Sequence, residues 1–536
     1  MSSISSDHHV VLFPFMSKGH IIPILHLAQL LLRRPRVTVT IFTTPANRPF
    51  TSKFLSNTTA SCSIIDIQYC KRDCNIFQVF LFDILDENGL PFIEKTANRF
   101  TPESMFYVLE KTVHRLLRKR LPYPENIPEN PVGVESTDKL PSMSLYVPFT
   151  RATKLMQPHF ERALESLPHV SFMVSDGFLW WTLDSANKFG FPRFVFYGMN
   201  NYVMCVSSSV GANRSLSGVQ SDDELVTPPE FPWIKITKKD FDPPITDPEP
   251  KGPQFELFID QIVSTSNSYG MIVNSFYELE PLFADHCNRV VKPKSWCVGP
   301  LCLAELSPKN EEPKNELSKP AWIRWLDRKL DEGSSVMYVA FGSQAEISAQ
   351  QLKEIATGLE QSKVNFLWVI RKAESELGDG FEERVKGRGL VVRDWVNQKE
   401  ILWHESVQGF LSHCGWNSAL ESICAGVPIL AWPIMADQPL NARMVTEEIK
   451  VALRVETCDG SVRGFVKWQG LEKTVRELMG GEKGEKARTK VKELSEIARK
   501  AMEEEKGSSW LCWYQSKFVC HHNMTTQTKE QPSQRR

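Results

Sequence analysis

The strongest constraint on the fold of this chain is a strand, a tight turn and a helix that follow one another directly. The largely apolar run Val407 to Leu411 is typical of a buried strand, and residues 412–415 have turn composition. From Trp416 to Ala425, apolar side chains recur at helical spacing. Such a unit brings a helix N-terminus to a strand end, where unpaired backbone N–H groups and the helix dipole favour phosphate oxygens.

Polar side chains in this unit fit the same chemistry. Gly415, Asn417 and Ser418 surround the helix N-terminus, and His413 stands beside it as a further hydrogen-bond donor. The sequence therefore predicts an anion site for a phosphate or diphosphate group at this turn.

The same alternation of strands and helices runs through the rest of the chain. The apolar run His9 to Phe15 is followed by a helical stretch and by a second buried run, Val37 to Phe42, which is a βαβ opening of a parallel sheet. A second series of strands and helices begins after residue 320. With 536 residues the chain is too long for one core. We therefore predict an α/β protein with two Rossmann-like, doubly wound domains that face each other across a cleft.

Composition limits the partners and the compartment. Hydrophobic residues make up 42%, charged residues 24%, and the formal net charge is −1, which argues against nucleic acid or an anionic membrane as the main partner. The first apolar run has no basic leader and is broken by Pro14, so we expect neither a signal peptide nor a membrane span. The 12 cysteines, several in apolar segments such as Cys205 and Cys424, favour reduced core thiols over a disulfide framework. We expect a cytoplasmic monomer.

The stretch from Trp395 to Gln438, which includes the motifs WVNQ, HCGWNS and MADQ, resembles the donor-binding box of plant family-1 UDP-glycosyltransferases at its polar sites. The resemblance implies the GT-B fold, in which an N-terminal domain binds the acceptor and a C-terminal domain binds the UDP-sugar. It also implies an inverting, metal-independent transfer to a small-molecule acceptor.

The resemblance assigns the nucleoside to four residues of the box. Trp395 would stack on the uracil, and the backbone of Val396, where the family usually has alanine, would bind the edge of the base. Gln398 and Glu421 would hold the ribose hydroxyls, because a carboxylate accepts well from two neighbouring O–H groups.

The resemblance assigns the remaining polar residues to the diphosphate and to the sugar. His413, Asn417 and Ser418 would bind the diphosphate, with a contact from Ser343 in the turn AFGS on the other side. The residues that would surround the sugar are Trp416, Asp437 and Gln438. By resemblance, Trp416 and the terminal glutamine favour glucose, so UDP-glucose is the expected donor substrate and no cofactor is expected.

Two residues outside the box carry the expected catalysis. His20 and Asp176 both follow strands of the first sheet, so they can meet at one sheet edge. An acceptor hydroxyl needs a base at neutral pH, and imidazole has a suitable pKa. Asp176 would orient the ring, as the acid does in a hydrolase triad. The motifs KGHIIP and VSDGF resemble the family's catalytic histidine and aspartate positions.

The acceptor itself is less constrained by the sequence. Aromatic residues near His20, namely Phe15, Trp180 and Trp181, favour a flat apolar acceptor such as a phenolic, flavonoid or terpenoid. Tryptophans at helical spacing also occur in domain cores, and this alternative stays open.

The resemblance and the composition together divide the chain. The stretch 68–120 interrupts the pattern and is much shorter in relatives, so we interpret it as an insertion. The predicted segments are an N-terminal acceptor domain (1–300), a linker rich in charge and proline (301–320), a C-terminal donor domain (321–485), a helical region (486–510) and a disordered tail (511–536).

Three alternatives were weighed against this interpretation. A dinucleotide-dependent oxidoreductase should show G-x-G-x-x-G after the first strand, and FPFMSKGH has one glycine there. A second alternative is a catalytically impaired protein that binds sugar nucleotides, because the insertion and the altered C-terminus disturb the acceptor domain. The third is a metal-dependent glycosyltransferase with an Asp-x-Asp motif, which Asp240 to Asp242 would match.

No metal site is predicted. We interpret Asp240 and Asp242 as surface charge in a loop, because two lysines precede them and two prolines follow. Other candidate ligands lie in the tail, at a spacing that matches no standard zinc finger: Cys512, Cys520, His521 and His522.

Overall fold

The computed structural model describes residues 8–34, 36–56, 62–67, 133–304, 319–370 and 377–503. The suspected insertion at 68–120, most of the predicted linker, the tail 511–536 and the cysteines and histidines of that tail lie outside these ranges. The predictions about those segments stay predictions. Among them is the alternative that the insertion and the altered C-terminus leave a protein that binds sugar nucleotides without catalysis.

The N-terminal part of the chain forms a seven-stranded parallel sheet in the order β3-β2-β1-β4-β5-β6-β7. Its strands are β1 (His8–Phe13), β2 (Val37–Thr43), β3 (Cys62–Asp66), β4 (Phe172–Asp176), β5 (Arg193–Tyr197), β6 (Gly270–Val273) and β7 (Ser295–Cys297). The order reverses between β1 and β4, whose register pairs Phe13 with Ser175. In open parallel sheets this switch point is where ligands bind.

The C-terminal part forms a six-stranded parallel sheet in the order β10-β9-β8-β11-β12-β13. Its strands are β8 (Val336–Ala340), β9 (Asn365–Val369), β10 (Gly389–Val392), β11 (Val407–Ser412), β12 (Ile429–Ala431) and β13 (Ala452–Arg454). Here the switch point lies between β8 and β11, at the end of the strand that precedes the predicted anion site. The predicted fold class, two doubly wound parallel sheets with helices, is therefore confirmed.

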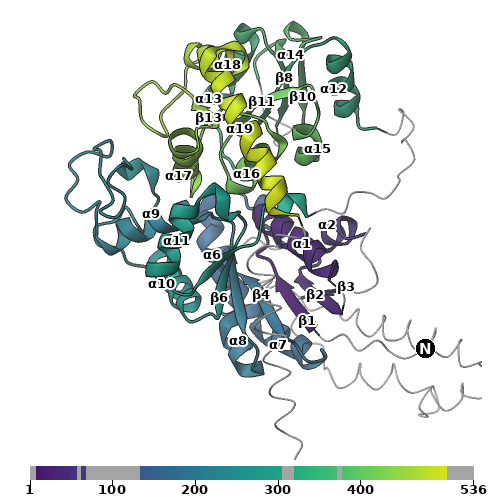
Figure 1. Cartoon of the computed structure of the whole chain (residues 1–536), viewed down its shortest axis with the longest axis vertical. Coiled ribbons are helices and arrows are strands. Elements are labelled where there is room, and N and C mark those ends of the chain that lie inside the picture. Colours follow the sequence, from purple (N-terminus) through teal and green to yellow (C-terminus); the bar gives the residue numbers. More distant parts are fainter. Residues whose placement is uncertain are drawn as a thin grey trace, which may run out of the picture.

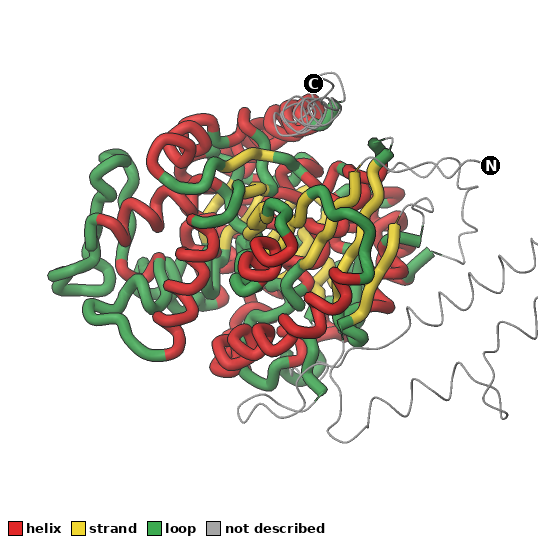
Figure 2. The backbone as a smooth tube through the Cα atoms, turned by 90° about the horizontal axis from the view of Figure 1, so that it is seen from below, coloured by secondary structure: helices red, strands yellow, loops and turns green. Residues whose placement is uncertain are grey.

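Helices connect the strands and lie on both sides of them (Figures 1 and 2). The α-helices of the N-terminal part are α1 (Lys18–Leu32), α2 (Arg48–Phe54), α6 (Tyr146–Ala152), α7 (Gln157–Glu165), α8 (Thr182–Phe189), α9 (Asn201–Ala212), α10 (Pro253–Ser266) and α11 (Pro281–Val290). Those of the C-terminal part are α12 (Ala321–Asp331), α13 (Ala349–Ser362), α14 (Phe381–Arg384), α15 (Gln398–Leu402), α16 (Trp416–Ala425), α17 (Gln438–Arg443), α18 (Trp468–Gly480) and α19 (Glu482–Ala501).

Local sequence explains where several of these helices begin and end. Ser348 caps α13 by accepting from the backbone N–H of Gln351, and Asn200 caps α9 in the same way. α16 ends at Gly426, which has φ of 73° and supplies the left-handed residue that commonly closes a helix.

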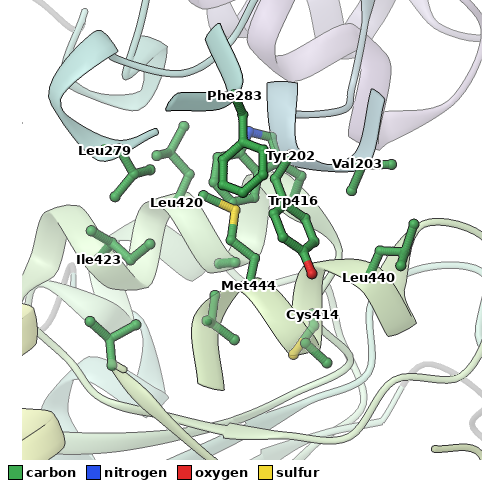
Figure 3. Close-up of a cluster of buried hydrophobic side chains, with 14 of the residues drawn as sticks. Tyr202, Val203, Leu279, Phe283, Cys414, Trp416, Leu420, Ile423, Leu440 and Met444 are labelled. Atoms are coloured by element: carbon green, nitrogen blue, oxygen red, sulfur yellow. The ribbon is translucent and has the colours of Figure 1, made fainter. Parts of the chain in front are cut away.

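The two parts share a buried apolar cluster, which fixes them against each other. Tyr202 and Phe283 of the N-terminal part pack with Trp416, Ile423 and Met444 of the C-terminal part (Figure 3). Helix α19 crosses the junction (Figure 1), and Met502 just beyond its end packs against the core of the first sheet. The two parts are therefore held together by contacts between segments far apart in the sequence.

One expectation about cysteines is wrong. The structure joins Cys205 of α9 to Cys287 of α11 by a disulfide, whereas the sequence favoured a reduced thiol at Cys205. The two residues are 82 positions apart, and only the packing of α9 on α11 brings them together. None of the described helices is long and apolar enough to cross a membrane.

Candidate active site

His20 and Asp176 meet at the switch point of the first sheet. His20 lies in the first turn of α1, Asp176 is the last residue of β4, and Nδ1 of the imidazole is 2.7 Å from Oδ2 of the carboxylate. The other carboxylate oxygen accepts from the backbone N–H of Phe178. The Asp176 side chain is fully buried, and that of His20 is 19% exposed. Because Nδ1–H is donated to the carboxylate, Nε2 is left as the basic atom.

Charges on both sides of the cleft set the basicity of His20. Burial by itself lowers the pKa of the imidazole, but the Asp176 carboxylate, through its charge and its hydrogen bond, together with the charge of Asp437, raises it above the ordinary 6.5. Burial in turn raises the pKa of the Asp437 carboxyl, against the effects of Asn441 and His20. A histidine whose pKa is raised binds a proton more strongly than free imidazole does, which suits a general base that acts in its neutral form.

Aromatic rings surround His20, but they are only partly those that the sequence indicated. The ring centroids of Phe15 and Phe178 lie 5.7 and 5.3 Å from that of His20. Tyr146 and Tyr197 contact Phe178 in turn. Phe178 is the last residue of the motif VSDGF, two positions after Asp176, so its place in the sequence already indicates a position near the proposed base.

The two tryptophans proposed to face the acceptor belong to the core instead. Trp181 is fully buried in the cluster beneath the sheet, and its indole N–H donates to Thr153. Trp180 belongs to the same cluster. The alternative of a core role, left open by the sequence, therefore holds for both.

The predicted anion site is built from two turns at the switch point of the second sheet. His413 and Gly415 follow β11, and Gly342 and Ser343 follow β8, its neighbour. The imidazole of His413 occupies the space where a Cβ on either Gly342 or Gly415 would stand, 2.6 Å from its Nε2. Gly342 also has φ of 75°. Both glycines thus allow the ring to lie against the helix N-terminus.

Replacing Gly415 by alanine should displace the His413 ring, because the new methyl group would stand 2.6 Å from Nε2. We expect UDP binding weakened about tenfold, which corresponds to an overpacking cost of about 1–3 kcal/mol. Calorimetric titration with UDP measures the effect. In a His413→Ala background the same substitution should cost little, and an equal loss there would show that the methyl group acts on something else.

The predicted ribose residues, Gln398 and Glu421, lie together beside the first two turns of α16. Nε2 of Gln398 donates to Oε2 of Glu421 at 2.8 Å and to Oγ of Ser418 at 2.9 Å. The Tyr338 hydroxyl donates to the amide oxygen of Gln398. Ser418, assigned by resemblance to the diphosphate, is thus held within the polar group that contains the carboxylate.

Trp395 has 48% of its surface exposed, whereas Val396 is buried. The ring of Phe50, on α2 of the N-terminal part, lies 6.0 Å from the Trp395 ring, centroid to centroid. The Lys18 ammonium stands 4.2 Å from the centre of the Phe50 ring. Phe50 of the N-terminal part therefore lies close to Trp395, the residue predicted to stack on the uracil, and Lys18 lies on the Phe50 ring.

Two residues that the resemblance assigns to the ligand, Trp416 and Asn417, also connect α16 to the N-terminal part. The indole of Trp416 is 2% exposed and donates to the backbone oxygen of Asn274 at 2.7 Å. The amide of Asn417 donates to the Gly19 backbone oxygen and accepts from the Asn274 side chain. The only polar group of the Trp416 side chain is therefore used in the contact between the two parts of the chain.

Asp437 and Gln438 lie at the start of α17. Asp437 accepts from the side-chain amide of Asn441 at 2.8 Å. The amide oxygen of Gln438 accepts from the backbone N–H groups of Ile434 and Met435. Since this oxygen already accepts two hydrogen bonds, the NH₂ group is the part of Gln438 suited to a sugar oxygen.

The interpretation as surface charge is wrong for Asp240, whereas Asp242 keeps 40% of its side chain exposed. Asp240 is 1% exposed and binds the Arg443 guanidinium through both carboxylate oxygens, at 2.8 and 2.9 Å. Asp242 binds Arg463 and the backbone N–H of Ala436. The flanking lysines and prolines suggested a solvated loop, and the partners, some 200 positions away, are visible only in the fold.

Comparisons with known proteins match this geometry. The family model described as UDP-glucoronosyl and UDP-glucosyl transferase matches residues 311–482. UDP-glycosyltransferase 90A1 of Arabidopsis thaliana is 55% identical, over 95% of this chain and 96% of its own length. The scopoletin glucosyltransferase of Nicotiana tabacum is 36% identical, over 94% and 95%.

Solved structures agree with the sequence relatives. Glycyrrhiza uralensis UGT73P12, complexed with glycyrrhetinic acid 3-O-monoglucuronide, superposes with a TM-score of 0.75 at 25% identity, covering 98% of both chains. Phytolacca americana UGT2, complexed with UDP-2fluoro-glucose and pterostilbene, gives 0.69 at 26% identity, covering 96% of this chain and all of the other. Together, the two parallel sheets, the family match and the relatives show that this chain is a GT-B glycosyltransferase and belongs to the plant family-1 UDP-glycosyltransferases.

Proposed function

We propose that this enzyme transfers glucose from UDP-glucose, with inversion, to a hydroxyl of a small apolar acceptor such as a phenolic, flavonoid or terpenoid. The observation that carries the proposal is the pair of His20 and Asp176, 2.7 Å apart, beside the N-terminus of α16. Asn417 in the first turn of that helix contacts the backbone of Gly19, the residue before His20. The proposed base and the proposed diphosphate site thus adjoin.

In the proposed reaction, Nε2 of His20 removes the proton of the acceptor hydroxyl as its oxygen attacks the anomeric carbon. The attack comes from the face opposite the UDP group, so the C–O bond to the diphosphate breaks and the configuration inverts. Backbone N–H groups at the N-terminus of α16 and the His413 side chain would stabilise the negative charge on the departing UDP. Because these groups supply the stabilisation, we propose that the transfer proceeds without a metal ion and survives EDTA.

The acceptor class is supported by the rings around His20 and by the names of relatives. Phe15, Phe178, Tyr146 and Tyr197 contact one another around the imidazole. Relatives include a scopoletin glucosyltransferase and, at 34% identity, the UDP-glucose flavonoid 3-O-glucosyltransferase 7 of Fragaria ananassa. Aromatic walls favour flat, apolar molecules that carry a hydroxyl.

The test is an acceptor panel of coumarins, flavonols and terpenols incubated with UDP-glucose and the full chain, with EDTA in a parallel series. Mass spectrometry detects the glucoside, and NMR of the anomeric proton gives its configuration. We expect a β-glucoside from at least one phenolic acceptor. Tight UDP binding with no glucoside from any acceptor would favour a protein that binds the sugar nucleotide without turnover.

The pH dependence of turnover should report the His20–Asp176 pair. The base acts when neutral, so kcat/KM should fall as pH drops through the raised pKa of His20, and the midpoint of this acid limb should lie above pH 6.5. In Asp176→Asn the raising charge is lost while burial remains, so the midpoint should move to lower pH and the maximal rate should fall. Asp184→Asn, at an exposed position on α8, is the control. An unchanged midpoint in Asp176→Asn would contradict the pairing.

We further propose that the enzyme acts in the cytoplasm as a monomer. The six free cysteines among the described residues, against one disulfide, favour a reducing compartment, and the formal net charge of −1 argues against a nucleic-acid or anionic-membrane partner. A fluorescent fusion tests the location, and light scattering of the purified chain tests the oligomeric state.

A further inference from the structure

Two carboxylates of the N-terminal part bind the C-terminal part, Asp242 at the loop that precedes α17 and Asp240 at the end of α17 itself. Asp240 closes the short 3₁₀ helix η4 (Lys238–Asp240), and Asp242 follows two residues later. Oδ2 of Asp242 accepts from the backbone N–H of Ala436 at 2.7 Å, and its Oδ1 pairs with the Arg463 guanidinium. One side chain therefore joins two segments of the opposite part of the molecule.

The loop that Asp242 holds is residues 434–438, at whose end stand the proposed sugar residues Asp437 and Gln438. Three successive backbone N–H groups of this loop are fixed by side chains. Gln438 accepts from the first two, and Asp242 accepts from the third. Ala436 has φ of 55°, a left-handed conformation that costs a non-glycine residue about 1 kcal/mol or more, so a partner for its N–H stabilises an otherwise unfavourable backbone. The backbone conformation of Ala436 sets the direction of the chain at the next residue, Asp437.

A buried ion pair anchors the same two segments farther along the helix. Asp240 binds Arg443, the last residue of α17, through both oxygens, and also accepts from the backbone N–H of Thr237 at 2.6 Å. Side-chain exposures of 0% and 8% leave this pair almost without solvent. Such a pair fixes position strongly, because separating it leaves two uncompensated buried charges.

We propose that Asp242 is a positioning residue for sugar recognition: by holding the Ala436 N–H and Arg463, it sets the place of Asp437 and Gln438 against the donor sugar. Asp240 with Arg443 anchors the helix behind that loop. This inference rests on the proposed function, because it assigns the sugar to the loop 434–438. In this arrangement the acceptor part of the molecule supplies the contact that shapes the donor's sugar site, so sugar recognition depends on the two parts being together.

The test compares UDP with UDP-glucose on the full chain. Asp242→Ala removes both contacts, whereas Asp242→Asn keeps an oxygen that can accept from Ala436 but loses the charge that faces Arg463. We expect Asp242→Ala to weaken UDP-glucose binding about tenfold while UDP binding stays within about twofold, because UDP lacks the sugar. Asp242→Asn should lie between wild type and Asp242→Ala. The KM for UDP-glucose should rise in the same order, with KM for the acceptor unchanged.

Controls separate positioning from loss of structure and from failure of the proposed function. Asp247→Asn, in the same loop and with a side chain that accepts from the nearby Glu249 N–H, should bind both ligands as wild type does. Equal weakening of UDP and UDP-glucose in Asp242→Ala, or no weakening of either, would overturn the inference. If wild type itself bound UDP-glucose no differently from other UDP-sugars and formed no glucoside, the proposed donor would be wrong, irrespective of Asp242.

Discussion

The His20→Ala enzyme should turn over acceptors about 10²–10⁴-fold more slowly than wild type, with UDP affinity within about twofold. The substitution removes the imidazole whose Nδ1 lies 2.7 Å from the Asp176 carboxylate and leaves the donor residues of the second sheet untouched. Steady-state kinetics with the best acceptor of the panel gives kcat, and calorimetry gives the affinity for UDP.

Two further variants sharpen this result. His20→Gln can still donate to the Asp176 carboxylate but accepts no proton at neutral pH, so it should be as slow as His20→Ala. His169→Ala, at an exposed position just before β4, should keep the wild-type rate. Full activity in His20→Ala would exclude His20 as the base, while normal activity in His20→Gln alone would reduce its role to orienting the acceptor.

Glu421→Ala should bind UDP about 10- to 100-fold more weakly, since hydrogen bonds to a charged group contribute about 1.5–3 kcal/mol. Glu421 is buried in α16, and Gln398 donates to its Oε2 at 2.8 Å, so the carboxylate is already oriented before a ligand arrives. Calorimetric titration measures the loss, and thermal unfolding in the absence of ligand checks that the fold is intact.

The assignment of Glu421 to the ribose is tested more specifically by the preference for UDP over 2′-deoxy-UDP than by the loss of affinity for UDP alone. Wild type should prefer UDP over 2′-deoxy-UDP, because the carboxylate accepts from the ribose hydroxyls, and Glu421→Ala should lose this preference. Glu400→Ala, at an exposed position on neighbouring α15, should retain it. If Glu421→Ala still distinguished the two ligands as wild type does, the carboxylate would not be the ribose contact.

Sequence patterns located most of the elements that build the site. α16 begins and ends at the predicted residues, Trp416 and Ala425, because a turn with glycine precedes an uninterrupted apolar periodicity. His20 and Asp176 were expected at neighbouring strand ends, and the structure places β1 beside β4. These predictions depend on local periodicity and on the rule that ligands gather at the carboxyl ends of parallel strands.

No local sequence pattern indicated the contacts between the two parts of the chain. Trp416 and Asn417 were assigned to the ligand, but their side chains contact Asn274 and Gly19. Asp240 was assigned to the surface and is buried against Arg443. In each case the decisive partner is more than 140 positions away, and the side chain's own neighbours in sequence are compatible with either role.

By itself, the sequence determined two parallel sheets, a helix N-terminus suited to a diphosphate, and a histidine and an aspartate at one sheet edge, because hydrophobic periodicity and turn chemistry are local properties. Only the tertiary structure decided which polar side chains face the cleft and which join its walls. The physical reason is that a buried donor or acceptor takes whichever partner the packing of distant segments brings within hydrogen-bond distance. For Asp242 that partner is the backbone of the loop that carries Asp437 and Gln438.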